Sequence, residues 1–561
     1  MSKIHGQYKV EGLAPTGLDI AGVWMRDQAV IDFLFDEPVE SITLSGTMVP
    51  YGQFHSRLSE GTLKVALRLD HHRLKKVEIP DSGDFDFEIP VNVTQTGMKP
   101  KRKKLRLDLG GVGFTNFLAW MGRLLEKQIW LPKSFRAWLQ PFRRQYKNRQ
   151  MLITRIAING ETMIDFDQPH SAFESDFVLR HSRIGLNVIG WFHGFLGVGE
   201  SARACVKAAR SAGLEVDPVD LKLKLNGGQS EDLWPEPLEE TGQRGITVAH
   251  VDAPQSYDLT KQHPVEMNRE NYRIGYWAWE LPAFPDSWIQ FASQFDEIWC
   301  PSEFCRDSIA PKLPVPVMVM PHAISLPWID HKPASWRSRF GLPPRAFLFL
   351  FSFDFNSYAP RKNPEAVIEA YRLAFSGMSS YEGRRVGLVL KMHGKGYDDA
   401  IRSKLETLKE EIEGLHIIDE TLSREELTGL QIACNCFVSL HRSEGFGLAL
   451  AEMMALGKPV ISTDWSATKE FIDEDTGYPV KCKLVKLNRN VGPYTKGQIW
   501  AEPDVIDAAG CMQQVVADPK FARRIGNNAK KRIERDFSEQ AIGERYLERI
   551  KAIALFQKPS F

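Results

Sequence analysis

The sequence lacks the features that would anchor it in a membrane or hold it together by disulfides. It contains no stretch of about 18 uncharged apolar residues, so no transmembrane helix is expected. The first residues, MSKIHGQYKV, have no apolar core of the kind that a signal peptide needs. Only seven cysteines occur in 561 residues, an odd number without repeated CxxC spacing. We therefore expect reduced thiols in the core and a cytoplasmic location.

The chain also lacks net charge, because 71 Lys and Arg residues balance 71 Asp and Glu residues. This balance excludes a globally basic nucleic-acid binder and a strongly acidic, solvating protein. The charge is nevertheless unevenly distributed along the chain. Residues 99–149, the basic window, contain 14 basic and two acidic residues, so the window carries a net charge of +12 and the remainder carries −12.

Apolar residues recur at helical spacing inside the basic window. They form one stripe over 114–129 and a second over 135–146, and Pro132 stands where the second helix can begin. We predict an amphipathic helical insertion over 99–149 that contacts an anionic surface at the inner face of the membrane. Packing of these helices on the protein's own surface is the alternative, and no nucleic-acid partner is expected.

The secondary structure that the sequence predicts differs between three parts of the chain. Residues 1–175 read as a β-rich accessory domain of the sandwich type, with a hairpin at Asn159-Gly160. From residue 183, continuous apolar strands alternate with helices, and a second run of this kind starts near residue 340. This alternation predicts an α/β chain with two doubly wound, Rossmann-like domains over 183–330 and 340–535 that face a cleft. We expect the last residues, 536–561, to form a helix that packs back on the first of these domains.

The strongest candidate for a ligand-binding segment is SLHRSEGFGLALAEMMALGKPVISTD, residues 439–464. A predicted strand ends before Glu444, and a helix opens near Leu448. Glycines and a helix N-terminus suit a diphosphate, whereas two carboxylates eight residues apart suit sugar and ribose hydroxyls. The candidate ligand-binding residues of this segment are Glu444, Gly445, Phe446, Gly447, Leu448 and Glu452.

These residues carry a family resemblance. The two glutamates form an E-x7-E motif, and 183–550 resembles the retaining GT-B glycosyltransferases of the glycosyltransferase 4 type (glycosyl transferases group 1). GYWAWELPAFPDSW (275–288), PSEF (301–304) and FSFDFNSYAPRKNPEAVIEAY (351–371) are similar to a bacterial polysaccharide subgroup.

The resemblance implies a role for each matching residue. Glu444 would contact the hydroxyls of the transferred sugar, and Glu452 would take the ribose. Lys362 matches the lysine with which the family neutralises the diphosphate leaving group. The family's arginine would stand at Ser357 in this chain, and we expect the neighbouring Arg361 to substitute for it.

In the first α/β domain, Gly197, Val198 and Gly199 resemble the family's glycine loop. This loop would close over the donor phosphates and the acceptor. The segment HVDAP offers Asp252 or His250 as the residue near the reacting sugar. Glu280 is either a buried partner of an arginine or a base at the acceptor site. A plain structural role is the alternative for each of these three side chains.

No covalent nucleophile is identifiable, and no DxD-like pair lies in a suitable strand-to-helix loop, so neither a metal nor another cofactor is expected. The resemblance implies retaining transfer of a hexosyl group from a GDP- or UDP-sugar to a glycan or lipid-linked acceptor, in cell-surface polysaccharide biosynthesis. Two alternatives stay open: a nucleotide-sugar epimerase or phosphorylase of the same fold, and a catalytically degenerate glycan-binding or scaffold protein.

Overall fold

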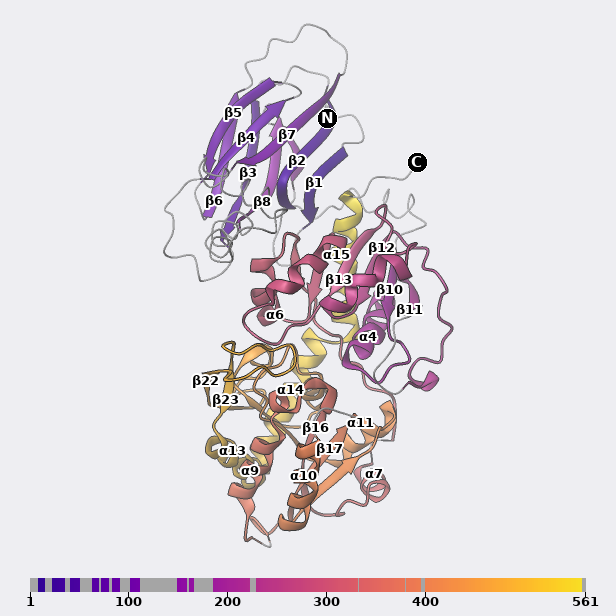
Figure 1. Cartoon of the computed structure of the whole chain (residues 1–561), viewed down its shortest axis with the longest axis vertical. Coiled ribbons are helices and arrows are strands. Elements are labelled where there is room, and N and C mark those ends of the chain that lie inside the picture. The colour runs from indigo at the N-terminus through magenta and orange to yellow at the C-terminus, as the bar shows by residue number, and fades with distance from the viewer. Residues whose placement is uncertain are drawn as a thin grey trace, which may run out of the picture.

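The computed structural model describes the backbone of nine N-terminal strands between residues 9 and 165, and of residues 185–221, 229–330, 332–378, 380–394 and 399–556. Three sheets follow one another along the long axis of the molecule (Figure 1). In the described residues, no helix is long and apolar enough to cross a membrane.

The N-terminal strands are antiparallel and form one hydrogen-bonded sheet in the order β5-β4-β7-β2-β8-β3-β6, with β1 on β2 and β9 on β8. The predicted hairpin is confirmed, because Ile158 pairs with Glu161 on either side of Asn159 and Gly160. The spacing favoured the two separate sheets of a sandwich, but β2 joins them, because its end at Val23–Met25 pairs with β8 and its residues 28–35 pair with β7. The strands are β1 (Lys9–Pro15), β2 (Val23–Phe35), β3 (Ser41–Pro50), β4 (Leu63–Leu69), β5 (His72–Ile79), β6 (Gly83–Pro90), β7 (Lys101–Gly110), β8 (Arg149–Ile158) and β9 (Glu161–Asp165).

Strand β7 corrects the prediction for the start of the basic window. The expected helical insertion over 99–149 is wrong for Lys101–Gly110, which pairs with β2 and β4. The physical reason is a period of two: Leu105, Leu107 and Leu109 alternate with charged residues, which is the pattern of a strand with two different faces. The two predicted amphipathic helices lie outside the described residues.

The first α/β unit contains a six-stranded parallel sheet in the order β11-β10-β12-β13-β14-β15. Its strands form because short apolar runs are buried on both faces, and β10 is buried at every residue. The elements are β10 (Gly185–Gly190), α4 (Gly197–Ser211), β11 (Glu215–Asp220), β12 (Ile246–His250), α5 (Leu259–Gln262), β13 (Tyr272–Tyr276), β14 (Glu297–Cys300), α6 (Glu303–Ile309) and β15 (Val317–Val319).

The second unit has the same construction, with the parallel order β18-β17-β16-β19-β20-β21 and a separate hairpin of β22 and β23. The predicted α/β class with two Rossmann-like sheets, the GT-B arrangement, is therefore confirmed. The elements are α7 (Pro333–Arg339), β16 (Phe347–Asp354), α8 (Ala359–Lys362), α9 (Pro364–Phe375), β17 (Val386–His393), α10 (Asp399–Glu411), β18 (Leu415–Asp419), α11 (Arg424–Ala433), β19 (Cys436–Ser439), α12 (Leu448–Ala455), β20 (Val460–Thr463), β21 (Tyr478–Val480), β22 (Cys482–Lys486), β23 (Ile499–Pro503), α13 (Val505–Ala517) and α14 (Pro519–Asp536).

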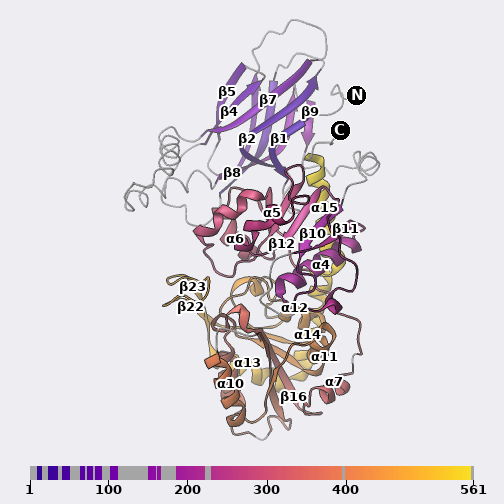
Figure 2. The same cartoon turned by 45° about the vertical axis from the view of Figure 1, so that its right-hand side comes forward.

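The C-terminal helix α15 (Glu539–Phe556) leaves the second unit and lies beside α4 of the first, as both views show (Figures 1 and 2). Ile542, Tyr546 and Ile550 are buried in the same core as β10 and β12. Tyr546 stacks on Trp299 of β14, with ring centroids 5.2 Å apart. The chain thus crosses twice between the two units, which fixes the cleft between them.

Candidate functional site

A cleft of about 2090 Å³ lies between the two α/β units. Its walls come from the loops that follow the carboxyl ends of strands in both sheets, which is where doubly wound sheets bind ligands. The volume exceeds the roughly 300–1,000 Å³ of a pocket for one small ligand, so the cleft has room for two substrates. Of the residues predicted from the sequence, Gly197, Asp252, Arg361, Lys362, Glu444, Gly445, Phe446, Gly447 and Leu448 line it.

The loop between β19 and α12 holds Glu444 in a fixed position. The Glu444 backbone N–H donates to Ser466 Oγ at 2.9 Å, and Ser466 itself adopts a left-handed backbone with a φ of 67°. Gly447 has a φ of 102° and precedes the first turn of α12, and a Cβ there would lie 2.7 Å from Thr468 Cγ2. Only glycine fits this position, so the chain turns sharply and the α12 N-terminus faces the cleft.

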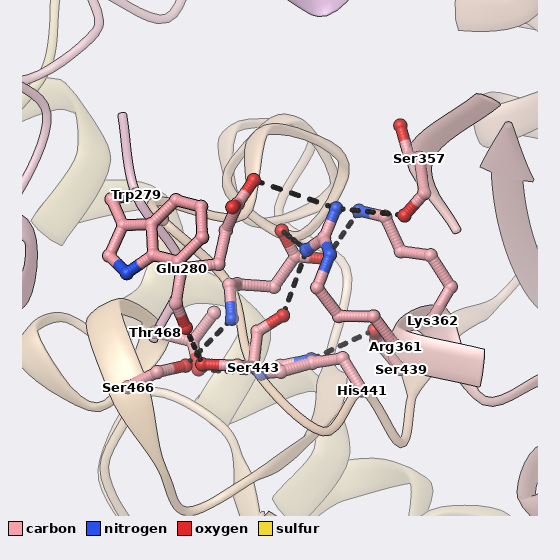
Figure 3. A network of polar contacts seen from close by, with 12 residues as sticks. Trp279, Glu280, Ser357, Arg361, Lys362, Ser439, His441, Ser443, Ser466 and Thr468 are labelled. Atoms are coloured by element: carbon pink, nitrogen blue, oxygen red, sulfur yellow. Dashed lines mark hydrogen bonds and ion pairs between the residues drawn. The ribbon is translucent and has the colours of Figure 1, made fainter. Parts of the chain in front are cut away.

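Two cations approach Glu444 from the end of α8. Lys362 Nζ forms an ion pair with Glu444 Oε1, and Arg361 Nη1 lies 3.3 Å from Oε2. Arg361 also donates to the backbone oxygens of Ser443 at 2.9 Å and Ser357 at 3.2 Å (Figure 3). The guanidinium thus contacts the backbone at Ser357, the position where the resemblance would place an arginine. Asn363 ends α8 in a left-handed conformation and donates to Leu440 O at 3.0 Å, which ties the two loops together.

The electrostatics of this cluster favour charged groups. Burial opposes ionisation of Glu444, but Lys362 and Arg361 outweigh it and lower the pKa of this carboxyl to about 2. Burial lowers the pKa of Lys362, and Glu444 opposes that shift. Arg361 is 4% exposed and stays protonated. Carboxylates therefore hold both cations, and an anionic ligand that entered here would compete with Glu444 for them.

Glu280 brings a second carboxylate to the same guanidinium, from the first α/β unit. Its Oε1 lies 3.7 Å from Arg361 Nη2, and its Oε2 accepts a hydrogen bond from Tyr494 at 2.9 Å. Ser443 donates to the Glu280 backbone oxygen. Tyr494 belongs to the loop of the β22–β23 hairpin, and its ring packs 5.3 Å from that of Trp279. This hairpin and Glu280 therefore join the two units directly beside Arg361.

Glu452, the second glutamate of the E-x7-E motif, does not line the cleft. Its carboxylate is 5% exposed and accepts hydrogen bonds from Arg424 Nη2 at 2.7 Å and Gln431 Nε2 at 2.6 Å. Arg424 Nε lies 3.5 Å from Glu200 Oε1 in the first turn of α4. Burial disfavours the Glu200 anion, but Arg424 and Arg203 reverse this effect and lower its pKa to about 2. Glu452 is thus part of an ion-pair chain across the two units.

On the opposite wall, the structure separates the two candidates of the HVDAP segment. His250 is fully buried behind the wall, whereas Asp252 lines the cleft. The enclosing protein and the nearby Glu280 carboxylate raise the pKa of Asp252 to about 6. Gly199 also lies behind the wall, where a Cβ would meet Trp191 O at 2.5 Å, while Gly197 is exposed.

Several residues of the site carry no recognisable signal in the sequence. Tyr494 lies in an irregular hairpin loop, and Ser466 and Arg424 follow strands without forming a motif. Ser443 directly precedes the E-x7-E motif, but its contact with Glu280 joins residues 163 positions apart. In the part of the chain that the structure describes, no three His, Cys, Asp or Glu side chains cluster as metal ligands. The arrangement can bind an anion between cations and hold hydroxyl groups on carboxylates.

Comparison with known proteins identifies part of the chain. Residues 336–532 match the family described as Glycosyl transferases group 1. Over 198 residues the chain is 24% identical to the alpha-1,3/1,6-mannosyltransferase ALG2 of Dictyostelium discoideum. That stretch covers 34% of this chain and 42% of the relative, so the match spans less than half of the relative's length.

Two solved structures show a distant likeness over a longer part of the chain. A glycosyltransferase from Rickettsia africae is 14% identical, with a TM-score of 0.48 over 66% of this chain and 99% of its own. HepE from Anabaena, solved with UDP-glucose, is 12% identical, with a TM-score of 0.48 over the same shares. Residues 336–532, which carry Lys362, Glu444 and helix α12, thus match the glycosyl transferases group 1 family that the resemblance in the sequence indicated.

Proposed function

We propose that the protein is a retaining glycosyltransferase that moves a hexosyl group from a nucleotide diphosphate sugar to a glycan or lipid-linked acceptor. The observation that carries this proposal is the cluster of Glu444, Lys362 and Arg361 at the α12 N-terminus, inside a cleft with room for two substrates. The family match over 336–532 supports the same activity. A role in cell-surface polysaccharide biosynthesis follows from the subgroup resemblance and is part of the proposal.

In the proposed reaction, an acceptor hydroxyl oxygen bonds to C1 of the hexosyl group while the bond from C1 to the diphosphate oxygen breaks on the same face. The hydroxyl proton passes to the departing diphosphate, so no covalent intermediate is needed. Lys362 and Arg361 stabilise the charge that develops on the diphosphate. Glu444 exchanges its ion pairs for hydrogen bonds from hydroxyls of the transferred sugar, which orients C1.

The donor can be found by thermal denaturation in the presence of nucleotides. Because a ligand that binds only the folded protein stabilises it by about 2.7 kcal/mol at 100 times its Kd, a true donor or its nucleoside diphosphate should raise the melting temperature measurably. We expect a shift with UDP or GDP and the matching sugar nucleotide, and transfer products by mass spectrometry with a lipid extract as acceptor. No shift with either nucleotide would instead favour a glycan-binding or scaffold protein.

Asp252 predicts the pH dependence of the reaction. Its pKa of about 6 means that the carboxylate forms as the pH rises through 6, so its ability to accept a hydrogen bond from an acceptor hydroxyl is gained in that range. We expect kcat/KM to rise through pH 6 and Asp252→Asn to lower it by about 10- to 100-fold at pH 7.5, because the variant loses a hydrogen bond to a charged group. The measurement is a pH profile of both proteins; an unchanged limb at pH 6 in the variant would assign that limb to another group.

A further inference from the structure

His322 lies in the segment between β15 and α7, where the first α/β unit meets the loop between β19 and α12. Its imidazole lines the cleft, is 9% exposed, and packs edge-on against Phe446 with centroids 5.0 Å apart. Nδ1 lies 3.1 Å from Ser201 Oγ and 3.2 Å from the Tyr276 hydroxyl. The ring is therefore held by the first unit and presented to the loop that follows Glu444.

The hydrogen bonds determine which ring nitrogen carries the proton. The Tyr276 hydroxyl donates its single proton to Met320 O at 2.7 Å, so towards His322 it can only accept. Nδ1 must therefore be the donor. The Ser201 hydroxyl is then free to donate to His250 Nδ1, 2.8 Å away. Burial lowers the pKa of His322 to about 4, so the ring is neutral near pH 7 and Nε2 carries a lone pair.

The lone pair on Nε2 restricts the chemistry of any partner. Among the described residues, none donates a hydrogen bond to this atom, and it is not enclosed in the core. An acceptor nitrogen disfavours phosphate oxygens, which have no proton to give at neutral pH, and it suits a hydroxyl group. The cation pair of Arg361 and Lys362 serves the diphosphate, which leaves His322 for the uncharged part of the ligand.

We propose that His322 Nε2 accepts a hydrogen bond from a hydroxyl of the hexosyl group and so helps to select and orient the transferred sugar. The proposal rests on the proposed function, because it takes the sugar to lie against the loop that follows Glu444. His322 approaches that loop at Phe446, whereas Glu444 carries the cations at its other side. The sugar is thereby held from both units, and its position depends on their mutual arrangement.

Two isosteric variants separate the functions of the two ring nitrogens. In His322→Asn the amide nitrogen takes the place of Nδ1 and keeps the bonds to Ser201 and Tyr276, but nothing replaces Nε2. In His322→Gln the amide oxygen can take the place of Nε2. The experiment measures the Kd of UDP-glucose, UDP, GDP-mannose and GDP by titration calorimetry on the full chain, with donor KM and kcat for whichever sugar nucleotide is turned over.

We expect His322→Asn to weaken the sugar nucleotide about tenfold, since a hydrogen bond between neutral groups is worth roughly that factor. The Kd of the matching nucleoside diphosphate stays unchanged, and His322→Gln recovers most of the loss. Tyr276→Phe removes the hydroxyl that fixes the proton on His322 Nδ1. We expect this variant to weaken binding of the sugar nucleotide about threefold and to leave binding of the nucleoside diphosphate unchanged. This variant tests the proposal again if His322→Asn does not fold.

The outcomes distinguish the two proposals. If the wild-type protein binds neither nucleotide nor sugar nucleotide, the proposed function fails and the role of His322 fails with it. If the wild-type protein binds and His322→Asn and Tyr276→Phe bind equally well, only the role of His322 is overturned. If the variants weaken the binding of the nucleoside diphosphate and of the sugar nucleotide equally, His322 has a structural role beside the loop between β19 and α12. That outcome also overturns the proposal.

Discussion

Glu444→Gln is expected to lower kcat for hexosyl transfer by about 10²–10³ while nucleoside diphosphate binding stays the same or tightens. The two effects diverge because Glu444 has two partners. In the proposed reaction its carboxylate orients the transferred sugar, but in the structure it also neutralises Lys362 and lies 3.3 Å from Arg361 Nη1. The amide cannot hold these cations by charge, so they become available to the diphosphate. Steady-state kinetics with the identified donor and calorimetry with its nucleoside diphosphate measure both effects.

Two control variants make this result specific. Glu474→Gln removes an exposed carboxylate and should change neither quantity. Lys362→Met should lower kcat and also weaken nucleoside diphosphate binding, because it removes a cation that serves the ligand in the ground state and in the transition state. Unchanged transfer by Glu444→Gln would remove this residue from the reaction, and weaker diphosphate binding would contradict the competition for Lys362.

The two parallel sheets were predictable because their strands are buried on both faces and therefore read as continuous apolar runs. FLFLFSFD, the sequence of β16, is an example. Strand β11 was not predicted, because EVDPVD has no such run: Asp217 is buried there, and its Oδ1 lies 3.0 Å from Arg244 Nη2. That ion pair joins residues 27 positions apart, so no local sequence pattern indicates it.

The candidate site likewise contains residues that the sequence predicts and contacts that it does not predict. Glu444 and the turn at Gly447 were predicted because the motif is contiguous and its glycine is required by the backbone, whereas Lys362 was predicted from the family resemblance. Their mutual contact, and the contact of Arg424 with Glu452, arise only when separate elements meet across the sheet edge or the cleft. In the basic window, the run of Lys and Arg residues masks the alternation that forms β7.

Arg549→Met is expected to destabilise the first α/β unit by about 3–5 kcal/mol. Arg549 of α15 and Glu297 of β14 form an ion pair in which both side chains are fully buried, with Nε 3.0 Å from Oε1. Removing the guanidinium leaves a carboxylate in the core whose remaining donors, among the described residues, are Trp299 Nε1 at 2.6 Å and the Tyr272 hydroxyl at 2.9 Å. The midpoint of urea denaturation, followed by tryptophan fluorescence, measures the loss.

The double variant Glu297→Gln/Arg549→Met tests whether the unpaired charge causes that loss. Because the amide is uncharged, the double variant should regain a large part of the stability, although each single change removes one partner of the pair. Arg545→Met, one turn earlier on α15 and half-buried, is the matched control and should cost about 1 kcal/mol or less. If the double variant is as unstable as Arg549→Met, the loss comes from the packing of α15 on the first unit. The C-terminal helix would then hold that unit through its apolar face, with Ile542, Tyr546 and Ile550 in the shared core.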